Sequence, residues 1–362
     1  MTQYFKDLYN KFINTTIGKK IIIIILIFLY LFLLLSVSIK VNYEVTTPGS
    51  INDTVATTSD VKPFASVDID TKNEAGKIYT VGVYSHVRVS LFQYLISQLS
   101  SNIAFDNYNP DTDLSADEQY KLGVIQKDSS IINAIIVAYE AAAKVDSSIK
   151  IDYEFQGIVV NYVYQNSESN LMVGDIITHV GETKITNYQM FKDLRDQYSG
   201  SESFQLTVIR DGKEEKIKAK KIAVTEDGIT SYLLGIGATT LFKINEEGTF
   251  PKYKIANDYR SIGSSGGAML SLAVYNAIVS EDITKDKFII GTGTIDIDGN
   301  IGNIAGVEQK IATAAMYQTD IFFVNSYNYE DALKKYNQIK PSFKLVKVDT
   351  FTEILNALAG EK

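Results

Sequence analysis

An uninterrupted apolar run near the amino end of the chain sets the strongest constraint on its structure. The stretch Ile21–Ile39, IIIIILIFLYLFLLLSVSI, contains no charged residue. As a helix it would be about 28 Å long, close to the roughly 30 Å hydrocarbon core of a bilayer. Four lysines precede the run against a single acidic residue, Asp7, whereas the residues after it carry charges of both signs. The positive-inside rule therefore predicts a single-pass protein of the cell membrane, with residues 1–20 in the cytoplasm and the remainder outside.

A cleaved signal peptide is the alternative interpretation of the same run. Ser36, Val37 and Ser38 have the small-x-small pattern of a cleavage site. The apolar run is at the long end for a signal peptide, in which the apolar region spans about 7–15 residues. We therefore expect an uncleaved anchor at residues 21–39.

The composition excludes several classes of protein and site. A net charge of −8 argues against nucleic-acid binding, which needs a basic surface. The chain has no cysteine, so disulfides, thiol nucleophiles and cysteine-type zinc sites are impossible. The two histidines, His86 and His179, lack the spacing of a metal-binding pair, and the chain has no phosphate-binding GxxxxGK[ST] loop. We expect no metal, no cofactor and no use of ATP.

Residues 41–150 are expected to form a mixed β-rich and helical segment to which the sequence assigns no role. Residues 76–87 are β-branched and aromatic enough for a strand, and residues 90–99 have helical spacing with Ser90 as a candidate cap. Asparagine, aspartate and proline predict a loop at residues 102–114. An apolar face predicts a helix at residues 130–145.

Residues 151–222 resemble a PDZ domain of the bacterial type. The resemblance rests on the order of three pieces: LMVGDIITHVGETKI, a helix with Asn187 as its cap, and the hairpin LTVIRDGKE. In that family a peptide adds as an extra strand beside a binding loop and a helix. Carried over by position, the peptide-binding residues would be Phe155, Gly157 and Ile158 of the loop, with Tyr188, Phe191 and Leu194 of the helix. A β-rich packing module without a ligand is the alternative.

The last segment, residues 232–360, alternates between strand-like and helical patterns, which predicts an α/β arrangement of a sheet covered by helices. It contains the glycine-rich stretch Gly263-Ser264-Ser265-Gly266-Gly267, which is followed by an apolar helical run. An exposed serine at such a turn is typical of a nucleophile. A simple helix N-cap is the alternative role for Ser265.

Two histidine-dependent templates fit this stretch poorly. The G-x-S-x-G elbow of α/β-hydrolases needs a histidine after the serine, but both histidines precede it. The chymotrypsin order of histidine, aspartate and serine is allowed by the positions of the histidines. However, Ser264 replaces the aspartate of that motif, and His179 falls in the segment that resembles a PDZ domain.

A buried lysine is the remaining candidate base, because loss of hydration lowers the pKa of an amine and makes its neutral form available. Lys310 has Val307, Ile311 and Ala314 on the same helical face. Lys285 and Lys287 lie in a polar loop, where lysines stay solvated. A surface lysine that covers apolar neighbours with its stem is the alternative for Lys310.

Residues 236–358 resemble the proteolytic domain of Lon-type proteases, which use a Ser-Lys dyad. The matching pieces are the serine loop, GTGTIDIDGNIGNIAGVEQKIATA and DIFFVNS. The whole order of segments is similar to that of membrane-anchored, ATP-independent Lon-like proteases of the Gram-positive bacterial type. The implied fold class is an α/β (α+β) Lon-type proteolytic domain with a β-rich PDZ domain and one N-terminal transmembrane helix.

The family's motifs give roles to individual residues. Gly-Pro-Ser-Ala-Gly falls on residues 263–267, so the resemblance implies Ser265 as nucleophile and Lys310 as base. Thr292, Ser264 and Gly263 are implied to orient the lysine or to form the oxyanion site. The chain departs from the family at Ser264, where proline is usual, and at Gly266, where alanine is usual. Both changes would loosen the loop.

The sequence thus predicts a serine endopeptidase that acts on peptides or proteins outside the cytoplasm, with the PDZ domain recruiting or gating the substrate. A catalytically inactive scaffold that binds extended peptides is the alternative. The distance from the Lys310 amine to Ser265 Oγ discriminates between the two, since general-base catalysis needs hydrogen-bond contact of about 2.6–3.2 Å.

Overall fold

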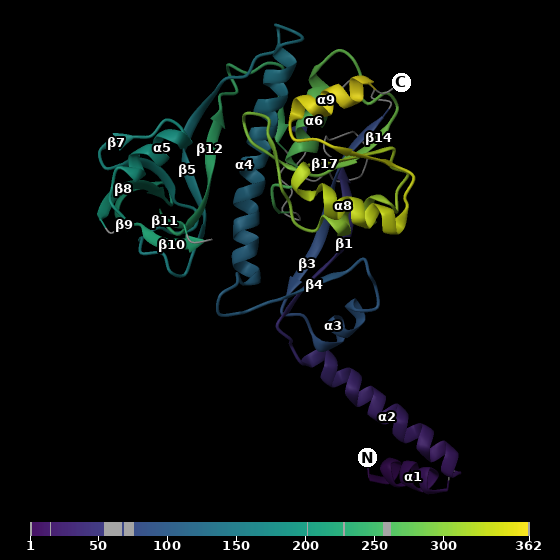
Figure 1. Cartoon of the computed structure of the whole chain (residues 1–362). Coiled ribbons are helices and arrows are strands. Elements are labelled where there is room, and N and C mark those ends of the chain that lie inside the picture. The colour runs from purple at the N-terminus through teal and green to yellow at the C-terminus, as the bar shows by residue number, and fades with distance from the viewer. Residues whose placement is uncertain are drawn as a thin grey trace. The chain divides into compact units, whose positions relative to one another are not determined.

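The structure is a computed structural model that describes residues 2–14, 16–53, 67–68, 76–200, 202–226, 229–255 and 262–360 of the chain (Figure 1). It divides into two compact units. One is formed by Met1–Thr47 with Ser85–Asp113, and the other by Pro48–Tyr84 with Leu114–Lys362. Part of the segment expected at residues 41–150, namely 54–66 and 69–75, lies outside the described residues.

The first unit carries the apolar run as one helix. Helix α2 (Ile17–Ser38) is long and apolar enough to cross a membrane, and its side chains are almost all exposed. The prediction of an N-terminal apolar helix is confirmed. A shorter helix, α1 (Thr2–Ile13), precedes it, and α3 (Leu91–Ser97) belongs to the same unit. Ser90 and Gln93 form a capping box at the start of α3, so the predicted cap at Ser90 is confirmed.

A strand lies within the loop that was expected at residues 102–114. Strand β4 (Ala104–Asn107) pairs antiparallel with the first residues of β1 (Tyr43–Asp53). The prediction was wrong there because the strand is short and is defined by its partner rather than by its own composition.

The second unit contains a mostly parallel sheet in the order β18-β17-β14-β3-β1. Strand β14 is parallel to β3 and to β17, and β17 is parallel to β18. In the described residues of this part, the other elements are two short strand pairs and four helices. The bounds are β2 (Val67–Asp68), β3 (Lys77–Val87), β13 (Lys254–Ile255), α6 (Gly267–Ile278), β14 (Phe288–Gly291), β15 (Thr294–Ile295), β16 (Ile301–Gly302), α7 (Val307–Ala314), β17 (Ile321–Val324), α8 (Ser326–Ile339), β18 (Lys344–Lys347) and α9 (Phe351–Gly360).

The mixed α/β character expected for the C-terminal segment is confirmed. The hairpin predicted to turn at Asp298-Gly299 is present only as the short pair β15 and β16, in which Ile295 faces Ile301. Gly299 has a φ of +81°, which favours glycine at the turn. The preceding strand, β14, belongs instead to the parallel sheet.

A second, antiparallel sheet occupies the middle of the chain in the order β12-β5-β6-β8-β9, and we call it the middle sheet. A short strand, β7, pairs with β6, and helix α5 packs beside it. The hairpin of β8 and β9 turns at Asp211-Gly212 as predicted. The bounds are β5 (Tyr153–Val163), β6 (Ile176–Val180), β7 (Thr183–Lys184), α5 (Tyr188–Asp196), β8 (Ser203–Arg210), β9 (Lys213–Lys220), β10 (Ile222–Glu226), β11 (Ile229–Leu233) and β12 (Ile236–Ile244).

The middle sheet extends beyond the segment predicted for it. Strand β12 comes after residue 232, where the C-terminal domain was expected to begin, yet it pairs antiparallel with β5 from Ile236↔Val163 to Ile244↔Tyr153. The boundary predicted between residues 222 and 232 therefore does not coincide with a break in the sheet.

Helix α4 (Ala116–Ala143) connects the middle sheet with the C-terminal part (Figure 1). It packs against α6 on one side and against β12 and β5 on another. The sequence predicted a helix only from residue 130, because residues 116–129 are largely polar and lack a clear apolar stripe. The capping box of Ser115 and Glu118 starts the helix earlier, and tertiary packing buries its second half.

Candidate active site

The glycine-rich stretch forms a tight loop before α6. The helix begins at Gly267, so Ser265 lies two residues ahead of it rather than within it. Gly263 has a φ of +93°, a conformation that favours glycine. The carbonyl oxygen of Ser265 accepts hydrogen bonds from Gly293 N–H at 2.8 Å and from the Thr292 hydroxyl at 3.1 Å. These contacts fix the backbone of the serine against the segment after β14.

Helix α7 brings Lys310 to this loop. Its Nζ lies 2.7 Å from Ser265 Oγ and 2.9 Å from Thr292 Oγ1. The Lys310 side chain is only 2% exposed, and its neighbours Val307, Ile311 and Ala314 are buried as well. The alternative of a solvated surface lysine is therefore wrong.

Burial changes the chemistry of the Lys310 amine. Removal from water lowers the pKa of Lys310 from 10.5 to about 7, because the charged form loses its hydration. A large fraction of the amine is then neutral near neutral pH.

The hydrogen bonds of Thr292 define where the lone pair of the neutral amine is available. Thr292 donates its one hydroxyl proton to the Ser265 carbonyl, so its Oγ1 accepts an N–H from Lys310. This leaves the lysine lone pair for the Ser265 hydroxyl proton at the 2.7 Å contact. The arrangement fits the orienting role that the resemblance implied for Thr292.

Helix α4 holds the serine loop from the other side. Gly263 N–H donates to the Gly123 carbonyl at 2.8 Å, and Ser130 Oγ donates to the Ser264 carbonyl at 3.2 Å. Sequence reasoning missed Gly123 and Ser130, because both act through a contact with a loop more than a hundred residues away. The N–H of Gly263 is thereby occupied, so its expected contribution to an oxyanion site is wrong.

Two other backbone donors are available at the loop. Among the described residues, the N–H groups of Ser265 and Gly266 have no hydrogen-bond acceptor. Both precede the amino end of α6, where the helix dipole favours negative charge. An oxyanion formed next to Ser265 Oγ would therefore find donors in these two groups.

Close packing explains the glycine at position 266. A Cβ atom placed on Gly266 would lie 2.9 Å from Thr80 Cγ2 of β3. On Gly267 it would lie 2.6 Å from Ser130 Oγ. At position 266, the space that an alanine methyl group would need is filled by the methyl group of Thr80. The loop is thus packed against β3 on one side and against α4 on the other.

The expected peptide-binding residues do not form an open groove. Phe155, Gly157 and Ile158 lie within β5 rather than in a loop, and Ile158 is fully buried. Strand β12 pairs with all three of them, while β6 pairs with the other edge of β5 at Ile158. The prediction of a binding loop at residues 155–158 was wrong, because a later segment of the same chain occupies the strand edge.

The helix that was expected as the other wall packs inward. Phe191 is buried, and Leu194 and Phe155 are half-buried in the same hydrophobic cluster as Ile158. Tyr188 is exposed. The described arrangement of these residues is that of a packed sheet and helix.

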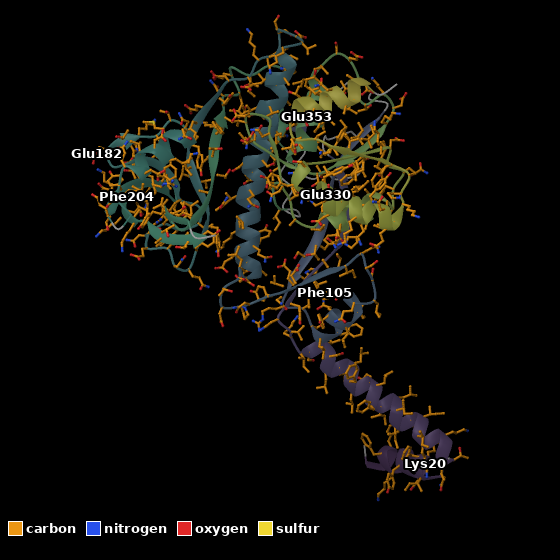
Figure 2. All side chains as sticks on the ribbon, in the orientation of Figure 1. Lys20, Phe105, Glu182, Phe204, Glu330 and Glu353 are labelled. Carbon is orange, nitrogen blue, oxygen red and sulfur yellow. The ribbon has the colours of Figure 1, made fainter. Side chains whose placement is uncertain are left out.

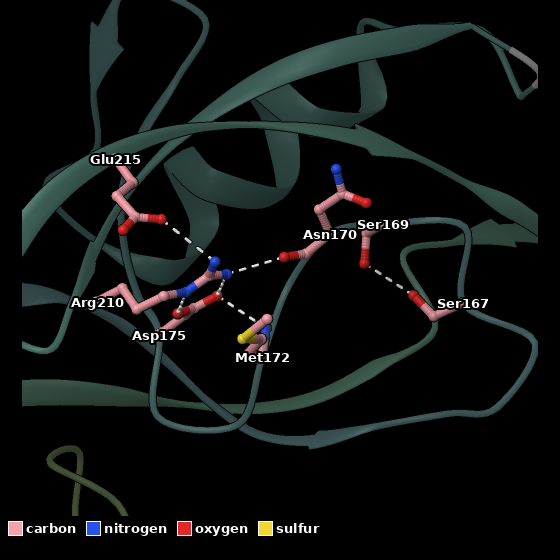
Figure 3. A network of polar contacts seen from close by, with 7 residues as sticks. All are labelled: Ser167, Ser169, Asn170, Met172, Asp175, Arg210 and Glu215. Atoms are coloured by element: carbon pink, nitrogen blue, oxygen red, sulfur yellow. Dashed lines mark hydrogen bonds and ion pairs between the residues drawn. The ribbon is translucent and has the colours of Figure 1, made fainter.

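A buried ion pair fixes one turn of the middle sheet (Figure 3). The guanidinium of Arg210 donates to both carboxylate oxygens of Asp175 at 2.8 and 2.7 Å, and to the Asn170 carbonyl at 2.8 Å. Asp175 also accepts Met172 N–H at 2.8 Å and is 1% exposed. The pair thereby holds the turn that enters β6.

Metal ligands do not cluster near the serine loop or elsewhere in the described part of the chain, where no group of three or more His, Asp or Glu side chains is placed to hold a metal ion. His179 contacts the Thr178 hydroxyl through Nδ1 at 2.9 Å.

Comparisons with known proteins add little to this geometry. No protein-family model matches the chain, and no curated protein matches it at a significant level. Among solved structures, part of the chain is similar to the PDZ domain of an SdrC-like protein from Listeria monocytogenes. The identity is 21%, the match covers 23% of this chain and 86% of that one, and the TM-score is 0.20. A TM-score this low carries no weight for the function of the chain.

Proposed function

We propose that the protein is a membrane-anchored, ATP-independent serine endopeptidase of the Lon-like type, with Ser265 as nucleophile and Lys310 as general base. The observation that supports it most is the 2.7 Å separation of Lys310 Nζ from Ser265 Oγ, made by a lysine that is almost completely buried. A buried amine next to a serine hydroxyl is the arrangement that general-base activation needs.

The reaction follows from these contacts. Ser265 Oγ attacks the carbonyl carbon of the scissile peptide bond, while the neutral Lys310 amine takes the hydroxyl proton. The N–H groups of Ser265 and Gly266 stabilise the oxyanion. The Lys310 ammonium then gives its proton to the leaving amine as the C–N bond breaks, which leaves an ester on Ser265. Water attacks this ester, Lys310 takes its proton, and the proton returns to Ser265 Oγ as the acid product leaves.

In this proposal the remaining parts of the chain anchor the protein and control access of the substrate. Helix α2 would anchor the protein in the membrane, with the N-terminal tail in the cytoplasm and the protease outside. We assign to the middle sheet, as a PDZ-like element, the gating of peptide substrates. Because β12 pairs along the length of β5, a peptide strand can add there only after β12 has left that edge.

The test is chemical labelling of the full-length protein in liposomes by a fluorophosphonate, which phosphonylates activated serines with loss of fluoride. We expect the wild type and Ser264→Ala to react, and Ser265→Ala and Lys310→Met to stay unlabelled. The labelled peptide, identified by mass, should contain Ser265. Cleavage of an unfolded protein such as casein should follow the same pattern. Absence of reaction in the wild type at every pH up to about 9, where the amine is neutral, would favour the inactive scaffold instead.

A further inference from the structure

Helix α3 and the turn after it expose apolar side chains. Leu95 and Ile96 are exposed, and Leu99, in the turn after the helix, is 85% exposed. Ser97, by contrast, is buried. Since residues 95, 96 and 99 fall on one side of a helical turn, these side chains form one apolar face. Phe105 of β4, also exposed, belongs to the same unit (Figure 2).

We call Leu95, Ile96, Leu99 and Phe105 the outer patch. Aromatic contacts connect the helical residues of the outer patch with Phe105. Tyr94 of α3 stacks on Tyr43 of β1 at 4.3 Å between ring centroids, and Tyr94 also packs edge-on against Phe105 at 5.8 Å. Helix α3 therefore packs against the strand pair of β1 and β4, so the outer patch lies on a packed part of the first unit.

The end of α2 determines where the outer patch lies. Leu91 N–H, at the start of α3, donates to the Ile39 carbonyl at 2.8 Å, and Lys40 forms a bridge with Ser90. Helices α2 and α3 pack together, and Ser36 is the one residue of α2 that is buried. The 22 residues of α2 span about 33 Å, enough for the roughly 30 Å hydrocarbon core. A bilayer crossed by α2 would therefore have its surface at the level of α3.

We propose that the outer patch inserts into the leaflet at the carboxyl end of α2, so that α3 lies in the membrane interface and fixes the unit to the lipid surface. The inference rests on the anchoring role proposed for α2. Continuity with α2 favours lipid as the occupant, because α3, which carries most of the patch, begins at the contacts that connect it to the end of that helix. Tyrosines at this level, such as Tyr43 and Tyr94, are typical of a membrane interface. An interfacial helix buries its apolar face about 5–10 Å into the boundary of headgroups and acyl chains.

The natural chain has no cysteine, so single-cysteine variants report one position each. We would label Leu99→Cys and Phe105→Cys with the environment-sensitive fluorophore NBD in the full-length protein, reconstituted in phosphatidylcholine and phosphatidylglycerol vesicles. The matched controls are Gln98→Cys and Asp106→Cys: Asp106 points to the opposite side of its strand from Phe105, and Gln98 lies about 100° around the helix from Leu99. Quenching by aqueous iodide is compared with quenching by lipids that carry a doxyl group in the acyl chain.

We expect labels at 99 and 105 to be quenched by the doxyl lipid and protected from iodide, with the reverse at 98 and 106. Equal iodide quenching at all four positions, in protein that floats with the vesicles and resists extraction at alkaline pH, would refute insertion while leaving the anchor intact. Protein that does not float at all would refute the anchor. Labels at 99 and 105 that are protected from both quenchers and cross-link between molecules would refute lipid as the occupant in favour of a second copy.

Discussion

The pH response of Lys310 gives the most direct test of the proposed dyad. Lys310→Met keeps an unbranched side chain of similar length and removes the amine. Burial lowers the pKa of Lys310 from 10.5 to about 7, and each pKa unit corresponds to about 1.36 kcal/mol. The difference between the two pKa values therefore amounts to about 5 kcal/mol in the free energy of unfolding.

The sign of the effect follows from proton binding. Between about pH 7 and 10.5 the unfolded chain holds one proton more at this lysine than the folded protein does. The free energy of unfolding therefore rises by about 1.4 kcal/mol per pH unit in that range. The gain is absent below the folded pKa and complete above the unfolded pKa. From pH 7 to pH 9 the wild type should gain about 2 kcal/mol relative to Lys310→Met, because the lysine is already half deprotonated at pH 7 and the methionine variant lacks this titration.

Two measurements on the detergent-solubilised full chain check this. Urea unfolding at several pH values gives the stability difference, and the rate of fluorophosphonate labelling gives the reactivity of Ser265. The labelling rate should rise tenfold per pH unit below about pH 7 and level off above it, since the neutral amine is the base. Lys335→Met is the control, because Lys335 is a second buried lysine, paired with Glu308 at 3.6 Å. The Lys335→Met variant should leave the pH dependence of the labelling rate unchanged. The same pH slope of stability in wild type and Lys310→Met, or a labelling rate that does not change from about pH 5 to 8, would refute the reasoning.

Three further predictions concern the serine loop and the middle sheet. Ser265→Ala should lower peptide turnover on the order of 10³-fold or more, whereas Ser264→Ala should keep most of it, because only Ser265 Oγ contacts the lysine; the opposite ranking in a peptidase assay would transfer the nucleophile to Ser264. Gly266→Ala should slow labelling of Ser265, because its Cβ would lie 2.9 Å from Thr80 Cγ2. Thr80→Ser removes that methyl group and should restore the rate in the double variant, and a rate that stays low would assign the defect to another contact. Arg210→Met should lower the free energy of unfolding on the order of 3 kcal/mol, because Asp175 is left buried without its partner. Glu215→Gln, at the exposed end of the same network, should change stability by less than about 1 kcal/mol in urea titrations, and equal losses would contradict the assignment.

The sequence predicted the burial of Lys310 better than it predicted the segments that surround the serine loop. Lys310 was identified because Val307, Ile311 and Ala314 share one helical face, and that local pattern survives in α7. The resemblance to Lon-type proteases supplied the pairing with Ser265, 45 residues earlier in the chain. Periodicity alone could not have supplied it, since it says which face is buried but not which residue lies opposite.

The supports of the serine loop and the pairing of β12 with β5 depend on contacts between distant segments. Nothing in the polar start of α4 indicates that Gly123 would accept a hydrogen bond from Gly263. Likewise, the composition of residues 236–244 is compatible with a strand in either sheet. Strand β12 pairs with β5, but the residues of a strand alone say little about which other strand it will pair with.

The position of α4 has a consequence for how the two parts of the second unit fluctuate. The helix packs against β12, and through Gly123 and Ser130 it also holds the loop of Ser265. An opening that releases β12 from β5 would remove one of the surfaces against which α4 packs, so we expect the amide protons of β12 and of the serine loop to exchange together. Thermodynamic linkage then works in both directions. If acylation of Ser265 changes the free energy of releasing β12, a strand that replaces β12 changes the free energy of acylation by the same amount.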